Sequence, residues 1–332
     1  MRVLVTGSAG HLGEALMRIL PGAGIEPVGL DIAASAYTQH VGSITDRALL
    51  STALRGAEAI LHTATLHKPH IVTHSKQAFL ETNIAGTLAL LEEAVAAGIA
   101  RVVFTSTTSA FGAALTPAPG EPAAWIDETV QPVPKNIYGV TKTAAEDLCA
   151  LFAARHGLGC TVLRTSRFFP EPDDSAEMRA RYADTNAKAN EFLFRRVDLE
   201  DAATAHLAAL RSIAGPGFRR YVISATSPFT RADLPALRRD PAGVVAAIHP
   251  GFAPLYARLG YRMFPEIGRV YVNARARADL GWQPRHDFAS ILGQLDRGAP
   301  IGSALARAVG PKGYHAEVFA DGPYPTEEST AP

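Results

Sequence analysis

The sequence predicts a doubly wound parallel α/β sheet with a smaller C-terminal lobe. Short apolar runs alternate with segments of helical period over residues 1–170, which is the pattern of successive βαβ units. After Pro170 the alternation gives way to polar and proline-rich stretches. The chain has 332 residues, 47% of them hydrophobic, which suffices for one large domain or two unequal ones. We therefore expect a sheet domain over 1–170 and a lobe over 171–310.

The elements follow one another in the order that a parallel sheet requires. Apolar runs predict strands at 2–6, 27–31, 59–62, 101–105 and 160–164. Helical spacing predicts helices at 12–20, 47–54, 84–97 and 141–155. A further helix at 199–210 and strand at 220–224 indicate that 191–225 returns to the first sheet. Residues 311–332 are expected to be a tail that wraps the body or frays.

Composition argues against several classes of protein. Lys and Arg number 32, as do Asp and Glu, and zero net charge disfavours a nucleic-acid binder. No apolar run reaches the length of about 18 residues that a membrane span needs. The chain enters an apolar strand directly, so we expect no signal peptide. Cys149 and Cys160 are too few for a disulfide framework and fit a reduced, cytoplasmic protein.

A glycine motif follows the first predicted strand. Gly7, Gly10 and Gly13 have the GxxGxxG spacing and open a helix. Such glycines permit a tight turn, close approach of backbone to a pyrophosphate, and tight packing of helix on sheet. The plain alternative is an ordinary glycine-rich turn. Asp31, at the end of the second strand, favours a dinucleotide, because its carboxylate can accept hydrogen bonds from the ribose hydroxyls. It would repel a 2′-phosphate, and 32–35 contain no Arg, so we expect NAD and not NADP.

Hydroxyl groups and an ammonium group form a candidate catalytic set. Tyr138 and Lys142 stand four residues apart, on one face of a helix. We expect Lys142 to lower the pKa of Tyr138, so that the phenol can exchange a proton with a substrate hydroxyl. Residues 105–109 place hydroxyl side chains at a strand end, which in a parallel sheet faces the same crevice.

With these motifs, the sequence resembles the extended short-chain dehydrogenases/reductases of the NAD-dependent epimerase/dehydratase group. The resemblance covers roughly residues 1–300 and implies a Rossmann-type sheet. It rests on Gly7, Gly10, Gly13, Asp31, 62–64, Asn83, 104–107, Tyr138, Lys142, 163–164, 196–201, 205–206 and 280–284.

The resemblance also implies roles and a partner. Thr107 would bind the reacting oxygen beside Tyr138, Lys142 would hold the nicotinamide ribose, and Asn83 would support the nicotinamide end. The other residues implied to contact NAD are Ala9, His11, Leu12, Ser43, Ile44, His62, Ala64, Thr105 and Ser106. Ser43 stands where the family often has an Asp. A homodimer through helices at 83–97 and 141–155 is implied.

Three departures from the family bear on the reaction. Thr108 and Ser109 replace the Asp-Glu pair of the dehydratases, which argues against elimination of water. Arg167 replaces the Asn that reaches a sugar nucleotide. The segment 171–196 is shorter than the insert with which such enzymes grip the nucleotide. The stretch 170–172 instead resembles the uronate dehydrogenases, which act on a sugar acid without a nucleotide handle.

Four residues are substrate candidates, and a metal is not expected. Arg164 and Arg167 could serve a substrate carboxylate, although a structural ion pair is as good an interpretation of Arg164. His67, together with Lys68, could line the nicotinamide edge or the substrate mouth, and Thr108 is the fourth substrate candidate. The histidines His62, His67, His70 and His74 fit no zinc spacing.

Three functions are compatible with these residues. The first is an NAD-dependent oxidoreductase acting on a sugar, a sugar acid or a similar small polar molecule. The second is a nucleotide-sugar epimerase that reduces and reoxidises NAD without releasing it. The third is a non-catalytic NAD-sensing regulator, against which the retained Thr107, Tyr138 and Lys142 argue.

Overall fold

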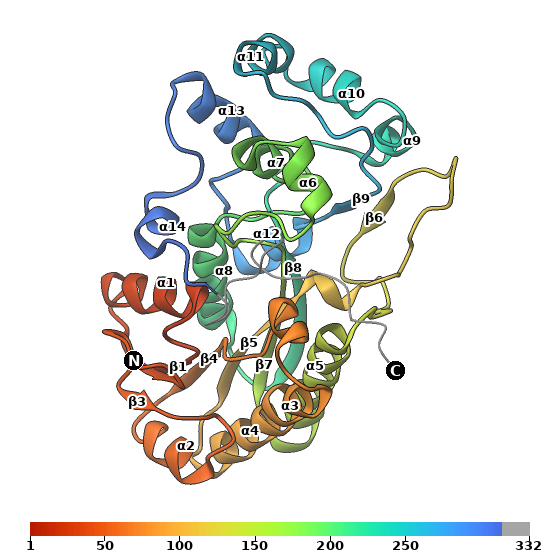
Figure 1. Ribbon diagram of the computed structural model, residues 1–332. Coiled ribbons are helices and arrows are strands. Elements are labelled where there is room, and N and C mark those ends of the chain that lie inside the picture. The colour runs from red at the N-terminus through yellow and green to blue at the C-terminus, as the bar shows by residue number, and fades with distance from the viewer. Residues whose placement is uncertain (314–332) are drawn as a thin grey trace.

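A seven-stranded parallel sheet forms the centre of the computed structural model, which describes residues 1–313 (Figure 1). The strand order is β3-β2-β1-β4-β5-β7-β8, and every neighbouring pair is parallel. The strands are β1 (Arg2–Thr6), β2 (Glu26–Asp31), β3 (His40–Val41), β4 (Ala59–His62), β5 (Arg101–Thr107), β7 (Gly159–Thr165) and β8 (Gly217–Ile223). The order reverses between β1 and β4, which is where a doubly wound sheet opens a crevice for a ligand. The predicted fold class is confirmed.

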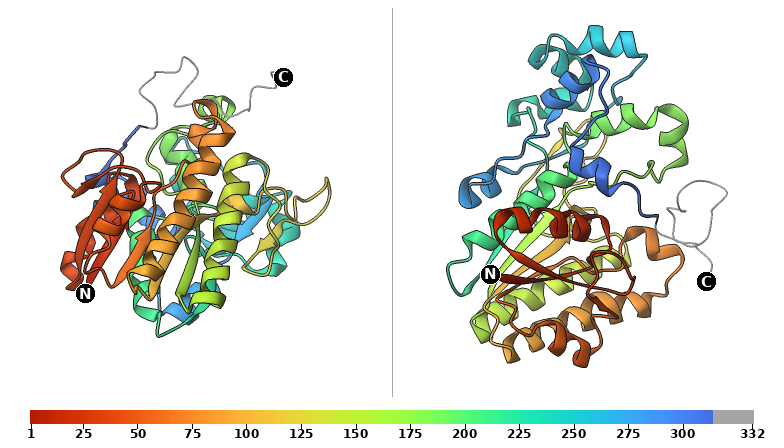
Figure 2. Two further views of the ribbon diagram at one scale, coloured as in Figure 1. Left: turned by 90° about the horizontal axis from the view of Figure 1, so that it is seen from below. Right: turned by 90° about the vertical axis from the view of Figure 1, so that its left-hand side faces the viewer.

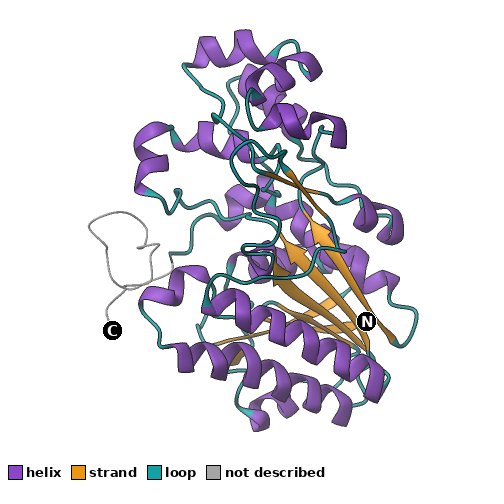
Figure 3. Cartoon of the chain, turned by 90° about the vertical axis from the view of Figure 1, so that its right-hand side faces the viewer, coloured by secondary structure: helices purple, strands orange, loops and turns teal. Residues whose placement is uncertain are grey.

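Helices cover both faces of this sheet (Figure 3). One face carries α1 (His11–Ile19), α8 (Leu199–Ser212), α12 (Ala274–Leu280) and α14 (Ala304–Val309). The other carries α2 (Arg47–Ala53), α3 (Lys76–Phe79), the π-helix η3 (Leu80–Ala85), α4 (Gly86–Ala96) and α5 (Ile137–His156). Successive residues of a strand point to opposite faces, so Val3 and Val5 pack in the first core and Leu4 packs in the second.

The smaller lobe lies beyond the carboxyl edge of the sheet (Figures 1 and 2). It contains α6 (Ala176–Arg181), α7 (Asp184–Glu191), α9 (Leu234–Leu237), α10 (Pro241–Ile248), α11 (Phe252–Leu259), α13 (Phe288–Asp296) and the two-stranded sheet β6 (Ala124–Ile126) with β9 (Arg269–Tyr271). Its core is rich in aromatic rings, among them Tyr182, Phe264 and Phe288. Short 3₁₀ helices are η1 (Pro21–Ala23), η2 (Lys68–Val72), η4 (Thr108–Ala110) and η5 (Arg231–Asp233).

The boundaries between the sheet domain and the lobe differ from the expected ones where segments distant in sequence pair. The segment 199–223 returns to the sheet, as predicted, through α8 and β8. By contrast, β6 joins the lobe because it pairs with β9, and α12 and α14 pack on the sheet domain. Helix α5 starts at Ile137 and not at 141, because Asn136 caps it by accepting from the N–H of Gly139 at 2.9 Å. Tyr138 therefore lies in its first turn.

Two further expectations concern the chain as a whole. Of the expected tail, 314–332 lie outside the described residues, and 311–313 return to the sheet domain. No helix within residues 1–313 combines the length and the apolarity that crossing a membrane would take.

Candidate active site

The glycine loop brings the N-terminus of α1 to the carboxyl edge of the sheet. Gly7 has a φ of 73°, and a Cβ there would lie 2.7 Å from the backbone nitrogen of Ala64. A Cβ on Gly13 would lie 1.9 Å from the carbonyl oxygen of Gly7. Only glycine fits either position without a shift of the backbone. The tight turn presents the first-turn N–H groups of α1 to an anion.

A cavity of about 830 Å³ extends from this loop across the sheet edge. Its cofactor end, as we call it, is lined by Gly7, Ala9, Gly10, His11, Leu12, Gly13, Asp31, Ile32, Ser43 and Ile44. Its middle is lined by residues that include Ala64, Thr105 and Ser106. Its substrate end is lined by residues that include His67, Lys68, Thr107, Thr108, Tyr138, Arg167, Asp173, Asp174 and Arg195. The cavity therefore joins most of the predicted cofactor residues to the predicted catalytic ones.

Asp31 is held at the wall of the cofactor end by two backbone groups. Its Oδ2 accepts from the N–H of Ala9 at 2.9 Å, and its Oδ1 accepts from the N–H of Ala33 at 2.9 Å. Each carboxylate oxygen can accept a further bond. The glycine turn, the helix N-terminus and this fixed carboxylate fit the pyrophosphate and the adenosine ribose of a dinucleotide.

Thr107 and Tyr138 meet where the two ends of the cavity join. Thr107 ends β5 and Tyr138 opens α5, and the Thr107 hydroxyl lies near enough to the phenol to lower its pKa. Burial raises the pKa of Tyr138 to about 12, and the Thr107 hydroxyl offsets only part of that rise. The phenol is therefore protonated at neutral pH in the protein alone.

Lys142 lies below the cavity and does not line it. Its side chain is buried, with Nζ 4.0 Å from the centre of the Phe104 ring. Burial lowers the pKa of Lys142 to about 7, although Glu146 on the next turn opposes this. The expectation that Lys142 lowers the pKa of Tyr138 is therefore wrong for this structure, since desolvation dominates both groups.

His62 and Asn83 also lie behind the cavity wall, which corrects their prediction as direct cofactor contacts. His62 is buried between the hydroxyls of Thr6 and Thr87, at 2.7 and 3.0 Å. Burial lowers the pKa of His62 to about 3, so the ring stays neutral. Asn83 Nδ2 donates to the carbonyl of Leu66 at 2.8 Å, and its Oδ1 accepts from the N–H of Leu66 at 2.8 Å. Asn83 thus fixes the loop that lines the cavity.

Arg164 is a structural residue, and the prediction that it contacts substrate is wrong here. Its guanidinium is fully buried and forms a paired contact with Glu146, with Nη2 to Oε2 at 2.8 Å and Nε to Oε1 at 3.0 Å. Glu146 also accepts from Ser106 Oγ at 2.5 Å and lies 2.9 Å from Arg220. A strand buried on both faces turns this side chain into the core instead of the crevice.

The substrate end contains an ionic network that includes Arg167. Arg167 Nη1 lies 2.8 Å from Asp173 Oδ2, and 3.7 Å from both Asp174 Oδ1 and Glu191 Oε1. Lys68 Nζ lies 2.5 Å from Asp174 Oδ2, and Arg195 Nη2 lies 2.7 Å from Glu191 Oε1. Burial alone would raise the pKa of Asp174, but Lys68 and Arg167 hold it at about 2. The predicted residues Arg167, His67 and Thr108 all line this end.

Sequence reasoning missed several residues of the site. They are Asp173, Asp174, Met178, Arg195, Tyr271 and Lys312, all of which line the cavity. The two aspartates directly follow 170–172, just beyond a strand end, which was a usable signal. Nothing in the local sequence marks Arg195 or Lys312, because each reaches the cavity from another layer of the fold.

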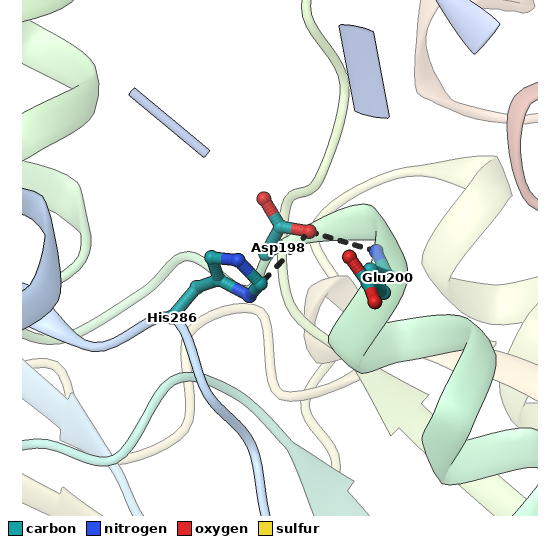
Figure 4. Close-up of side chains that lie close together, drawn as sticks. All are labelled: Asp198, Glu200 and His286. Atoms are coloured by element: carbon teal, nitrogen blue, oxygen red, sulfur yellow. Dashed lines mark hydrogen bonds and ion pairs between the residues drawn. The ribbon is translucent and has the colours of Figure 1, made fainter. Parts of the chain in front are cut away.

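A second cluster, Asp198, Glu200 and His286, has the donor types of a metal site (Figure 4). The three ligand atoms lie within 4.8 Å of one another. Asp198 Oδ1 accepts from the N–H of Glu200 at 2.8 Å as the cap of α8, and its Oδ2 accepts from the N–H of Ser303 at 2.9 Å. The Nδ1 atom of His286 lies 3.2 Å from Asp201 Oδ2. These bonds explain the cluster as a junction between α8 and the later chain.

Comparison with known proteins agrees with this geometry. The family model described as "NAD dependent epimerase/dehydratase family" matches residues 3–224. The chain belongs to this family. The predicted family and the predicted cofactor, NAD, are confirmed.

Relatives within the family differ in reaction. The chain is 35% identical over 171 residues to a UDP-glucose 4-epimerase of Rhizobium leguminosarum bv. trifolii, covering 49% of this chain and 50% of that one. It is 27% identical over 341 residues to a UDP-glucose 4-epimerase of Streptomyces lividans, covering 87% and 94%. It is 28% identical over 184 residues to a uronate dehydrogenase of Pseudomonas putida, covering 52% and 63%. The chain thus spans about half the length of the Rhizobium relative.

Solved structures show the same fold. A UDP-glucose 4-epimerase from Stenotrophomonas maltophila, crystallised with NAD and formylated UDP-arabinopyranose, superposes with a TM-score of 0.64 at 20% identity. The superposition covers 93% of this chain and 98% of that one. The two proteins therefore share the same fold over nearly their whole length.

Proposed function

We propose that the protein is an NAD-dependent dehydrogenase that transfers hydride between NAD and a carbinol carbon of a free sugar, a sugar acid or a similar small polar molecule. The charge balance of the substrate end carries this proposal. Each Lys or Arg that lines this end, among the described residues, already pairs with a carboxylate.

A nucleotide diphosphate is a poor match for such a network. Its two negative charges need cations that are not already neutralised, and Arg167 has three carboxylates within 4.0 Å. The hydroxyl groups of a neutral polyol, by contrast, can donate hydrogen bonds to Asp173 and Asp174 and accept hydrogen bonds from Lys68 and Arg167. The same crowding of carboxylates around Arg167 favours neutral sugars over sugar acids within the proposed class.

We further propose that Tyr138 transfers the proton. When bound, NAD would supply the hydride acceptor. Thr107 holds the substrate oxygen beside the phenol, and Tyr138 takes the hydroxyl proton in oxidation and returns it in reduction. Lys142, buried against the Phe104 ring one turn after Tyr138 on α5, supplies positive charge when protonated.

A substrate panel tests the proposal. Purified protein with NAD is mixed with neutral aldoses, hexuronates and UDP-glucose, and NADH is followed by absorbance. Steady NADH formation with free sugars, strongest with neutral ones, is the expected result. Isomerisation of UDP-glucose without net NADH, or no reaction with any free sugar, would contradict it.

The epimerase is the second candidate, since the Streptomyces lividans epimerase aligns over 87% of this chain, including the lobe.

The predicted homodimer also stays a prediction. Val140 and Leu151 of α5 are about half exposed, at 47% and 49%, and Leu80 of η3 is 39% exposed. Leu151 lies on the predicted segment 141–155, and Val140 and Leu80 lie just before the two predicted segments.

A further inference from the structure

The chain after α14 returns to the cofactor end of the cavity. Helix α14 lies beside α1 (Figure 1) and ends at Val309, which packs in the core shared with α1. Lys312 and Gly313 line the cavity. We call 310–313 the C-terminal strap. The strap belongs to none of the motifs that carry the family resemblance, and it lies outside residues 3–224.

Glu171 and Glu14 fasten the strap to the N-terminal turn of α1. The N–H of Lys312 donates to Glu171 Oε1 at 3.0 Å, and the same oxygen lies 2.9 Å from His11 Nε2. Both His11 and Glu171 are buried, and the Lys312 ammonium pairs with Glu14. The side chain of Lys312 is therefore held beside the N–H groups that the glycine loop presents.

Charge distinguishes Lys312 from the other cations of the cavity. Among residues 1–313, the Lys and Arg side chains that line it are Lys68, Arg167, Arg195 and Lys312. The first three belong to the network at the substrate end, whereas Lys312 stands beside α1. Glu14 has a second partner on its own helix, Arg18, with Nη2 2.7 Å from Oε1. Lys312 can therefore turn toward a ligand without leaving that carboxylate unpaired.

We propose that Lys312 is a ligand of the cofactor pyrophosphate. The strap carries its ammonium to the N-terminus of α1, where it adds a charged contact to the backbone N–H groups of the glycine loop. The inference concerns cofactor binding alone and does not depend on which substrate the enzyme takes.

Calorimetric titration of the full chain with NAD, ADP-ribose and adenosine tests this, because adenosine lacks the pyrophosphate. Lys312→Ala should raise the Kd for NAD and ADP-ribose about five- to tenfold, as for one charged contact partly open to water. Its Kd for adenosine should stay within about twofold of the parent. Lys312→Arg should retain most of the affinity. Lys76→Ala, which removes an exposed lysine of α3, is the matched control.

Two results would overturn the proposal. One is an unchanged NAD affinity in Lys312→Ala. The other is an equal loss for all three ligands, which would make the strap a purely structural element. Added salt gives an independent readout, since the Kd for NAD should rise more steeply with salt in the parent than in Lys312→Ala.

Discussion

The two ends of the cavity differ in what shapes them: backbone conformation at the cofactor end and charged side chains at the substrate end. At the cofactor end, backbone conformation decides the shape, through the positive φ of Gly7, the close approach of Gly13 and the N–H groups that fix Asp31. At the substrate end, charged side chains from η2, from the segment after β7 and from the end of α7 neutralise one another. The first is fixed by sterics within a short stretch of chain, and the second by electrostatics between distant stretches.

This difference indicates how one fold can keep its cofactor and change its substrate. A substitution at the glycine loop meets backbone atoms that cannot move aside. A substitution in the network alters charge without touching the sheet. Changes at the cofactor end should therefore alter NAD affinity, and changes at the substrate end should alter substrate preference, with Tyr138 serving both.

The largest effect is expected at Tyr138, where the ends meet. Tyr138→Phe removes the proton-transferring hydroxyl, and loss of general acid–base catalysis typically lowers the rate about 10²–10⁴-fold. The Kd for NAD should stay within a few-fold, because it depends on the glycine loop and Asp31. Tyr182→Phe, in the core of the lobe, is the control. Retention of more than about a tenth of the parental turnover would remove Tyr138 from the reaction.

The pH dependence of turnover sharpens the same point. Oxidation needs the deprotonated phenol, and the pKa of Tyr138 is raised to about 12. Below that pKa the deprotonated fraction grows about tenfold per pH unit, so oxidation should accelerate from neutral pH toward about pH 9. Reduction needs the protonated phenol and should not accelerate. Initial rates in both directions across this range provide the measurement, and a flat oxidation profile would argue against the phenol as base.

Arg164 and Arg167 stand three residues apart, but the first is structural and the second lines the substrate end, so variants of the two can be compared. Arg164→Leu leaves Glu146 with Arg220, so unfolding free energy should fall by about 3 kcal/mol, near the lower limit for breaking a buried pair. Denaturant titration measures this. The KM of the folded enzyme should hardly change, whereas Arg167→Leu should raise KM with a smaller loss of stability. The opposite pattern would return Arg164 to the substrate site.

Asp31→Ala tests the cofactor end alone. Hydrogen bonds to a charged group contribute about 1.5–3 kcal/mol, so NAD affinity should fall about ten- to a hundredfold. NADP should gain relative to NAD because the repulsion is removed, while Asp31→Asn should give intermediate values. Dissociation constants for both cofactors are the measurement. If the parent already bound NADP as tightly as NAD, Asp31 would not lie at the ribose.

The smallest effect is expected at the substrate end. Asp174→Asn frees Lys68 from its partner, so KM for neutral sugars should rise severalfold and binding of anionic sugars should improve. Glu177→Gln, which breaks an exposed pair with Arg181 on nearby α6, is the matched control. The Kd for NAD should not change. An equal shift in NAD affinity and KM would show that the two ends are not independent.

Local sequence patterns were sufficient to predict much of the fold and the cofactor end of the cavity. The alternation of apolar runs and helical periods predicted the parallel sheet, and the spacing of Gly7, Gly10 and Gly13 with Asp31 predicted the cofactor end. Both depend on residues close together in the chain, where conformation follows from sterics and periodicity. Periodicity likewise predicted the helix at 199–210 and the strand at 220–224, which the structure forms as α8 and β8.

Tertiary structure decided which polar side chains face the cavity. His62, Asn83 and Arg164 follow the family pattern, yet they turn into the core to satisfy buried partners. Desolvation, which no spacing reveals, reversed the expected pKa of Tyr138. Arg195 and Lys312 reach the cavity only because α7 and α14 pack where they do. The sequence by itself determined the backbone frame, whereas burial and long-range pairing, which exist only in the folded chain, determined the charge of the site.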